Sequence, residues 1–231
     1  MPGKFNDTTV VIPTYNEAGS IGRLIELLRK HYSGINIIVC DDGSIDGTIR
    51  IAKKHAATVI DRRALRRRKG LTGSVIDGIL AARTKYVVVM DGDLQHPPGA
   101  LGEIIAGVKS GKFRIVVAVR KHIPEWEMHR RIISKALMRV CDFALIARRS
   151  ARCGDIFSGY FGSDRRWLSS VIRSNRSRYV DEGYKVLYDT LKCIGRKEPI
   201  GEVGYTFAAR RYGSSKAGPM HAAALLKSIF K

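Results

Sequence analysis

Two aspartates and a glutamine follow an apolar run near the middle of the chain. Residues 86–90 have the composition of a buried strand, and Asp91, Asp93 and Gln95 come after them at alternate positions. Side chains of an extended chain alternate between two faces, so these three point the same way. Their oxygens suit Mg²⁺ or Mn²⁺, which keeps positions open for substrate phosphates. The plainer alternative is a strand that ends in a polar turn, and a lone Asp-x-Asp pair is more often only that.

Strand-like and helical segments alternate through the first half of the chain. This rhythm predicts an α/β fold with a mostly parallel sheet and helices on both of its faces. In open sheets of this kind, ligands bind beyond the carboxyl ends of the strands. The strand-like runs are residues 8–12, 35–40, 57–60, 85–90 and 114–119, and the helical ones are 20–31, 47–55, 73–82 and 99–109.

Two more polar clusters fall at strand ends of this kind. Residues 13–17 follow the first run, and Asp41 and Asp42, with Gly43 and Ser44, follow the second. A turn that opens a helix explains the second cluster structurally. Its carboxylates can also accept hydrogen bonds from a nucleobase or a ribose hydroxyl. We expect all three clusters in one site, because the carboxyl ends of parallel strands share one edge of a sheet.

Cationic residues gather in two segments outside this pattern. The run 62–69 leads into residues 70–73, Gly-Leu-Thr-Gly, and a glycine loop at a helix N-terminus can cradle a phosphate group. Residues 210–216 carry three cations with glycine and serine between them, which suits a mobile loop that closes over a diphosphate. Each segment is alternatively a solvated basic surface.

The last two helical segments are candidates for membrane contact. Residues 127–147 have apolar side chains at helical spacing and four cations, among them Arg130. A basic amphipathic helix can lie in a membrane interface, although it can equally pack on a core with one solvated face. Residues 217–231 are mostly apolar and predict a helix at or near the membrane. No run of 18 apolar residues occurs, so we expect no transmembrane domain. The length suits one large domain or two small ones.

The composition narrows the class of partner. The 231 residues include 41 Lys and Arg against 21 Asp and Glu, a net charge of +20. This surplus predicts nucleic acid, a phosphate-rich substrate or an anionic membrane surface as partner. The four cysteines form no Cys-x-x-Cys pair and no signal peptide is apparent, so we expect reduced thiols in a cytosolic protein. No Gly-x-Ser-x-Gly or Walker-type sequence occurs, which disfavours a serine hydrolase and a P-loop NTPase.

In their order along the chain, these motifs resemble glycosyltransferase family 2, whose members have the Rossmann-like GT-A fold. Within it they look most like the dolichyl-phosphate mannosyltransferase and polyprenyl-phosphate glycosyltransferase branch, to which residues 93–98 point. The chain departs from the family pattern at Gly92, where alanine is commoner. The matching segments are 11–17, 41–48, 69–71, 91–98, Asp155 with 158–160, 183–185, 205–207, Arg210 and 212–216.

The resemblance implies a role for each group of site residues. Those that would bind the nucleotide-sugar donor are Pro13, Tyr15, Glu17, Val39, Asp41, Asp42 and Gly92. Those that would hold Mg²⁺ or Mn²⁺ on the donor diphosphate are Asp91, Asp93 and Gln95. Those that would contact donor or acceptor phosphate are Arg120, Arg210 and Lys216, while Arg130 would lie near the lipid phosphate. The catalytic set is then Asp93, Arg120, Arg130, Arg210 and Lys216.

The implied reaction transfers a hexose to dolichyl or polyprenyl phosphate, with inversion at the sugar carbon. Mannose from GDP-mannose is the implied donor sugar, and UDP-glucose or another nucleotide sugar is the alternative. The protein would be a single catalytic domain over residues 1–231. It would be peripheral, on the cytoplasmic face of a membrane and against anionic lipid. A separate membrane-spanning subunit or a truncated membrane segment would complete it.

Two other classes of function are compatible with parts of the sequence. The net charge of +20 suits a nucleic-acid-binding protein. Against this, the aromatic residues do not interleave with the cations, and the acidic pairs at strand ends would repel phosphate in the absence of a metal. A relative that kept the fold and lost catalysis is the other alternative. The presence of Asp91, Asp93, Gln95, Arg210 and Lys216 argues against it.

Overall fold

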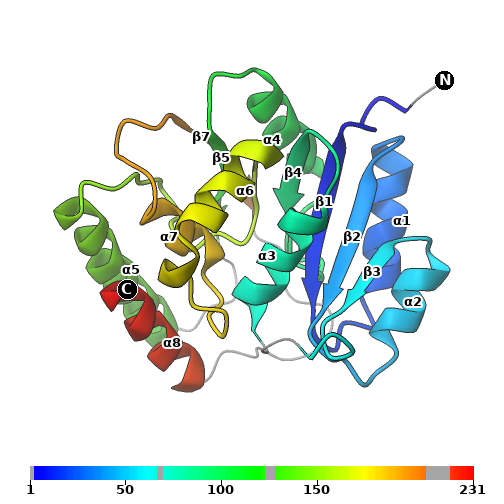
Figure 1. The fold of residues 1–231 in the computed structure, drawn as a ribbon, viewed down its shortest axis with the longest axis horizontal. Coiled ribbons are helices and arrows are strands. Elements are labelled where there is room, and N and C mark those ends of the chain that lie inside the picture. Colours follow the sequence, from blue (N-terminus) through cyan, green and yellow to red (C-terminus); the bar gives the residue numbers. More distant parts are fainter. Residues whose placement is uncertain (1–2, 67–69, 123–127, 207–218) are drawn as a thin grey trace.

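The computed structural model describes residues 3–66, 70–122, 128–206 and 219–231, with side chains described except at 122, 128–135 and 219–222. Within these residues, helices surround a seven-stranded sheet (Figure 1). The strands are β1 (Thr8–Thr14), β2 (Asn36–Asp41), β3 (Thr58–Asp61), β4 (Tyr86–Val89), β5 (Ile115–His122), β6 (Phe161–Asp164) and β7 (Ile200–Thr206). The helices are α1 (Ile21–His31), α2 (Thr48–Lys54), α3 (Leu71–Ala81), α4 (Gly99–Lys109), α5 (Met128–Ala147), α6 (Arg165–Ser174), α7 (Val186–Leu191) and α8 (Pro219–Phe230).

Helix α1 shows how the periodic sequence becomes structure. Ile21, Leu24, Ile25 and Leu28 recur at helical spacing and are fully buried. Burying one aliphatic side chain contributes about 1.5–3 kcal/mol, so this stripe holds the helix against the sheet. Three basic residues occupy the last turn, where they suit the negative end of the helix dipole.

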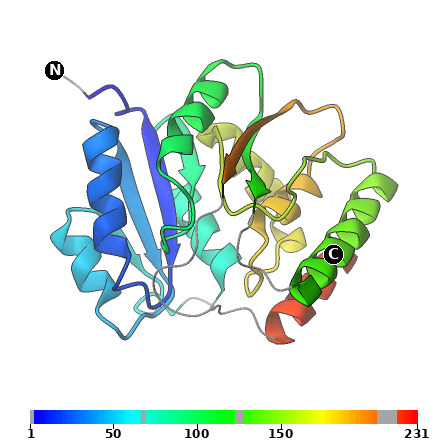
Figure 2. The same cartoon turned by 180° about the vertical axis from the view of Figure 1, so that it is seen from behind.

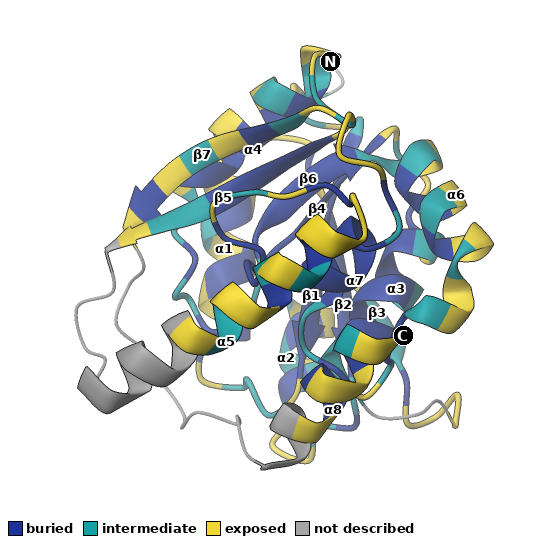
Figure 3. Ribbon diagram, turned by 90° about the vertical axis from the view of Figure 1, so that its left-hand side faces the viewer, coloured by how far each residue is buried: buried dark blue, intermediate teal, exposed yellow. Residues whose placement is uncertain are grey.

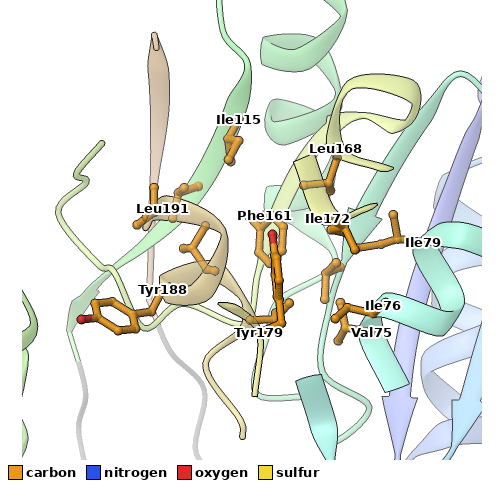
Figure 4. Packing of buried hydrophobic residues seen from close by; sticks show 14 of the residues in the cluster. Val75, Ile76, Ile79, Ile115, Phe161, Leu168, Ile172, Tyr179, Tyr188 and Leu191 are labelled. Carbon is orange, nitrogen blue, oxygen red and sulfur yellow. The ribbon is translucent and has the colours of Figure 1, made fainter. Parts of the chain in front are cut away.

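Alternate residues of the strands build two hydrophobic clusters, one on each face of the sheet. In β1, Val10 and Ile12 belong to the cluster covered by α1 and α4, whereas Val11 belongs to the cluster covered by α3, α6 and α7. Figures 1 and 2 show these two faces in turn. In the second cluster, Ile76 and Ile79 of α3 lie beside Ile172 of α6 (Figure 4). A sheet that is covered by helices on both faces needs a hydrophobic cluster on each face.

The strand order is β3-β2-β1-β4-β6-β5-β7. β1 pairs in parallel with both β2 and β4, so the sheet grows first to one side of β1 and then to the other. The predicted α/β fold with a mostly parallel sheet and helices on both faces is confirmed. β6 lies outside the expected pattern because it runs antiparallel to both β4 and β5.

Helices α5 and α8 lie on one side of the molecule, beyond α7 (Figures 1 and 3). Each packs its inner face on the second cluster, through Cys141 and Leu145 of α5 and Leu225 of α8. Their outer faces carry exposed large apolar side chains, namely Val140, Phe143, Ile146, Leu226 and Phe230. None of the helices in the described ranges combines the length and the apolar character needed to cross a membrane.

Candidate active site

The carboxyl ends of β1, β2 and β4 lie side by side, and polar residues follow each of them. Thr14 pairs with Asp41 at the ends of β1 and β2, and Met90, just after β4, donates its N–H to the Val11 carbonyl at 3.1 Å. The sheet changes its direction of growth between β1 and β4, which is where open α/β sheets bind their ligands. The three predicted clusters therefore meet at one edge of the sheet.

The loop after β1 is fastened to the loop after β2 by side chains that accept hydrogen bonds from backbone amides. Gly43 and Gly47 give the second loop its shape, with φ of +94° and +93° that glycine adopts readily. The bonds run from the amides of Asn16, Glu17 and Ala18 to Ser44 Oγ (2.7 Å), Thr48 Oγ1 (2.9 Å) and Asp46 Oδ2 (2.9 Å). The motif at 41–48 thus holds two loops of the site in a fixed relation.

Asp41 is fully buried at the end of β2. Its carboxylate accepts hydrogen bonds from the amides of Gly43 (3.0 Å) and Ser44 (2.7 Å) and from the hydroxyls of Thr14 (2.9 Å) and Ser44 (2.6 Å). A buried charge persists only when it is hydrogen-bonded in this way, so Asp41 holds the turn in shape. Its contact with a nucleoside stays a prediction.

Asp42 is joined to a buried arginine. Arg62 is 3% exposed and donates to Asp42 Oδ1 and, at 2.9 Å, to Asp77 Oδ2. The Gly70 amide donates to the other oxygen of Asp42 at 2.7 Å. Arg62 is therefore part of an internal network that fixes the start of α3, although the sequence placed it in a basic run.

The amides at the start of α3 are occupied by protein carbonyls. Thr72 N–H donates to the Gly183 carbonyl (2.9 Å) and Gly73 N–H to the Asp181 carbonyl (3.2 Å). The expectation that the glycine loop cradles a phosphate group is wrong for these two amides. The contact instead ties α3 to the segment that leads into α7.

Asp93 and Gln95 lie in a tight turn directly after β4. Asp93 Oδ1 accepts a hydrogen bond from the Gln95 amide at 3.1 Å, and Leu94 between them has a φ of +64°. This left-handed conformation costs a leucine on the order of 1–3 kcal/mol, so the surrounding packing must impose it. Strain of this kind concentrates at functional sites.

His96 supports Asp91 from the interior. Its Nδ1 accepts a hydrogen bond from the Asp91 amide at 3.1 Å, which assigns the proton to Nε2, 3.6 Å from Asp91 Oδ2. The ring stacks on Tyr160 with 4.9 Å between centroids. Burial lowers the pKa of His96 to about 4, so the ring is neutral at neutral pH. The neutral imidazole thus holds the backbone of Asp91 and leaves the charge of its carboxylate in place.

The segment 155–160 forms the wall beside Asp91. A Cβ on Gly159 would lie 3.0 Å from both carboxylate oxygens of Asp91, so any other residue would require that carboxylate to move. Asp155 accepts two hydrogen bonds from Arg120, at 2.6 and 2.9 Å. Burial opposes the charge of Arg120, but the hydrogen bonds and charge of Asp155 outweigh it and raise the pKa of Arg120. The site thus contains a cation held in place by its partner.

The expectation that the chain stays extended through Asp91, Asp93 and Gln95 is wrong, because these residues form a turn with Leu94 in a left-handed conformation. Their side chains still carry oxygen atoms of the kind that a hard divalent cation takes. Asp91 and Asp93 supply carboxylates and Gln95 a carboxamide oxygen, and the Asp91 side chain is 34% exposed. Within the described ranges no three His, Cys, Asp or Glu side chains form a metal-binding group. Mg²⁺ typically takes one or two carboxylates and completes its shell with water and substrate phosphates. The assignment of these residues as metal ligands stays a prediction.

The sequence matches the family model described as Glycosyl transferase family 2 over residues 9–188. The chain belongs to this family. Dolichol-phosphate mannosyltransferase of Pyrococcus furiosus is 32% identical over 218 residues, which cover 90% of this chain and 58% of that protein. Its namesake in Saccharomyces cerevisiae is 28% identical over 222 residues, covering 90% and 80%. This glycosyltransferase chain thus spans little more than half the length of the first relative.

A solved structure has the same fold. Glucosyl-3-phosphoglycerate synthase from Mycobacterium tuberculosis, in complex with Mn²⁺, uridine diphosphate and glucosyl-3-phosphoglycerate, aligns with a TM-score of 0.70. It is 21% identical, and the alignment covers 96% of this chain and 77% of that one. The comparisons confirm the family resemblance and the fold class of this glycosyltransferase.

The predicted donor-binding residues differ in their access to solvent. Tyr15 is 41% exposed and Glu17 is half-buried, whereas Pro13 and Gly92 are buried. Val39 is fully enclosed in the core, so its burial gives no support to a direct nucleoside contact. Arg210, Lys216 and the side chain of Arg130 lie outside the described residues. The roles of all these residues stay predictions.

The close approach of Gly159 to Asp91 gives a direct test of this site. We expect Gly159→Ala to lower glycosyl transfer by roughly 10- to 100-fold, as loss of support around a metal ligand commonly does. The metal concentration for half-maximal activity should rise, because the new methyl group displaces the carboxylate. Gly195→Ala is the matched control, since no atom lies within 4 Å of its Cβ position. Unchanged metal dependence in Gly159→Ala would contradict the assignment of Asp91.

Proposed function

We propose that this family 2 glycosyltransferase moves a hexose from a nucleotide sugar to dolichyl or another polyprenyl phosphate. The observation that carries the proposal is that Tyr15, Asp91 and Asp93 follow the neighbouring strands β1 and β4, between which the sheet changes its direction of growth. An exposed aromatic ring suits a nucleobase, and paired carboxylates suit a metal-bound diphosphate. The names of the two dolichol-phosphate mannosyltransferase relatives support a polyprenyl phosphate as acceptor.

The reaction needs positioning more than a strong base. An oxygen of the lipid phosphate is ionised at neutral pH and can attack the sugar without first losing a proton. When bound by Asp91, Asp93 and Gln95, Mg²⁺ or Mn²⁺ would offset the charge that develops on the departing diphosphate. Arg120, kept cationic by Asp155, adds a fixed positive charge beside them. The expected course is one displacement with inversion and no glycosyl-enzyme intermediate.

GDP-mannose is the donor we propose, because both relatives are named mannosyltransferases. UDP-glucose is the second candidate. It is favoured by the shared fold with an enzyme whose complex contains Mn²⁺ and uridine diphosphate.

A donor and acceptor panel tests the proposal. The purified protein is incubated with polyprenyl phosphate, each nucleotide sugar, and Mg²⁺, Mn²⁺ or EDTA, and lipid-linked sugar is measured. We expect product with one donor and none with EDTA. Transfer to phosphoglycerate but not to polyprenyl phosphate would overturn the proposed acceptor. A sugar trapped covalently on the protein would overturn the single displacement.

The outer faces of α5 and α8 are the proposed membrane-facing surface. Val140, Phe143 and Ile146 on α5 and Leu226 and Phe230 on α8 are between 48% and 83% exposed, and Figure 3 shows both helices on the same side. Exposed cations, Arg139 and Lys227 among them, accompany these apolar side chains. Each cation near an anionic surface contributes about 1 kcal/mol. These features support a peripheral position at the cytoplasmic face of a membrane.

Substituting Phe143 by serine is expected to weaken binding to anionic vesicles by roughly tenfold or more, because one buried Phe side chain contributes about 1.5–3 kcal/mol. Binding should also weaken as salt rises, because the cations are screened. Vesicle co-sedimentation measures both effects. Leu65→Ser is the matched control, since Leu65 is 58% exposed in the turn after β3, at the opposite edge of the sheet. Equal binding to neutral and anionic vesicles would contradict this surface.

A further inference from the structure

Lys185 is a cation of the site that the proposed reaction has not yet used. It immediately precedes α7, within the Gly183-Tyr184-Lys185 motif. Its Nζ lies 4.4 Å from the ring centroid of Tyr184 and 4.9 Å from that of Phe157. The ammonium donates one hydrogen bond, at 3.4 Å, to the Phe157 carbonyl. The two rings therefore fix the position of this charge without giving it a counter-charge.

The protein leaves most of the donor capacity of Lys185 unused. An ammonium has three N–H donors, and among the described residues no carboxylate oxygen lies within 4 Å of Lys185 Nζ. Its electrostatic neighbours are Arg120, Asp155, Asp91 and Cys141. Burial and the charge of Arg120 lower the pKa of Lys185 to about 8, so it is still mostly protonated at neutral pH. A half-buried cation with spare donors is poised to receive an anion.

The position of Lys185 indicates which anion. Phe157, which holds it, belongs to the same wall as Gly159, whose Cβ position lies 3.0 Å from the Asp91 carboxylate. Lys185 also lies beside α8, near Ala224, Leu225 and Ser228. Lys185 is thus between the carboxylates proposed to bind the metal and the helices of the proposed membrane-facing surface. Tyr15, on the loop after β1, lies on the other side of those carboxylates in the strand order.

We propose that Lys185 binds the phosphate monoester of the acceptor and presents it to the donor sugar. This inference rests on the proposed function, since it assigns a residue to the acceptor of that reaction. Arg120 is less suited to the task alone, because Asp155 takes two of its N–H donors. Lys185 adds the positive charge that a dianionic phosphate needs, on the side from which a membrane-bound lipid arrives.

The test separates acceptor binding from donor binding. Lys185→Met keeps the length and the ring contacts of the side chain but removes the charge, and Lys185→Arg restores it. We expect Lys185→Met to raise the KM for polyprenyl phosphate by roughly 10- to 100-fold, as loss of a charge-assisted hydrogen bond does. The affinity for the nucleoside diphosphate with Mn²⁺ should stay within about twofold. Lys185→Arg should recover much of the loss, and Lys53→Met on the exposed face of α2 should behave as wild type.

Several outcomes would overturn the proposal. An unchanged acceptor KM would do so, and an equal loss of nucleotide affinity would make Lys185 a donor residue instead. If Lys185→Met does not fold, Lys185→Gln gives the same comparison. Direct binding of a short-chain isoprenyl phosphate, measured calorimetrically with wild type and variant, keeps the two proposals distinct. Binding that depends on Lys185 without sugar transfer would support this site while refuting the proposed reaction. Sugar transfer with an unaltered acceptor KM in Lys185→Met would support the proposed reaction while refuting this site.

Discussion

Asp93→Asn is expected to reduce sugar transfer by roughly two to three orders of magnitude. The substitution keeps the shape of the side chain and the oxygen that accepts the Gln95 amide at 3.1 Å, so the turn after β4 should keep its conformation. What it removes is one of the two carboxylate charges proposed to hold the metal. Charge stabilisation by such an ion is worth several kcal/mol, and each 1.36 kcal/mol is a factor of about ten in rate.

The measurement must separate loss of metal from loss of fold. Mn²⁺ binding by calorimetry, kcat at saturating Mn²⁺ and thermal unfolding should be compared in the same preparation. Asp7→Asn is the matched control, because Asp7 lies just before β1, at the other end of the sheet, and pairs with Lys109 at 2.8 Å. The assignment fails if Asp93→Asn binds Mn²⁺ as tightly as wild type and retains its rate.

The elements of the first half of the chain could be predicted because each has a local signal. The apolar spacing at 99–109 corresponds to α4 with the same bounds, and the run at 35–40 corresponds to β2 within one residue. β6 has no comparable signal. Its four residues include glycine and serine, and its place is set by pairing with β4 and β5, which are distant in the sequence.

In the site, too, the features with a local sequence signal could be predicted, whereas those that depend on tertiary packing could not. The strand-end clusters could be placed together because parallel strands end at one edge. The residues that contact those clusters from other parts of the chain could not be identified from strand order. Arg62 looks in the sequence like the first residue of a basic run, yet it is buried against Asp42 and Asp77. Asp155 and Gly159 could be quoted as parts of a family motif, but their contacts with Arg120 and Asp91 arise only from tertiary packing.

Asp189→Asn is expected to destabilise the fold by about 3–5 kcal/mol, a large share of the 5–15 kcal/mol typical of a domain. Asp189 and Lys192 form a fully buried ion pair, with 2.7 Å between Oδ1 and Nζ. Lys192 also donates to the Ser228 carbonyl at 2.6 Å, and the Ser228 hydroxyl donates to Asp189. The pair therefore fastens α8 to α7, and its loss leaves a buried ammonium without a counter-charge. Urea unfolding gives the free energy, and hydrogen exchange at 223–230 should accelerate as α8 loosens.

An exposed ion pair provides the comparison. Glu198→Gln breaks a contact of 3.3 Å with Arg114 and should cost less than about 1 kcal/mol, because the side chains of Arg114 and Glu198 are 55% and 37% exposed.

The pH dependence of the stability of Asp189→Asn distinguishes an unpaired buried charge from a lost packing contact. Burial lowers the pKa of Lys192 below its ordinary value of 10.5, while Asp189 raises it. Removing Asp189 lowers that pKa further, so the folded variant binds fewer protons than the unfolded chain below pH 10.5. Its stability deficit should therefore narrow as the pH rises towards 10.5, whereas a deficit that does not change with pH would mean that Lys192 is not charged in the folded protein.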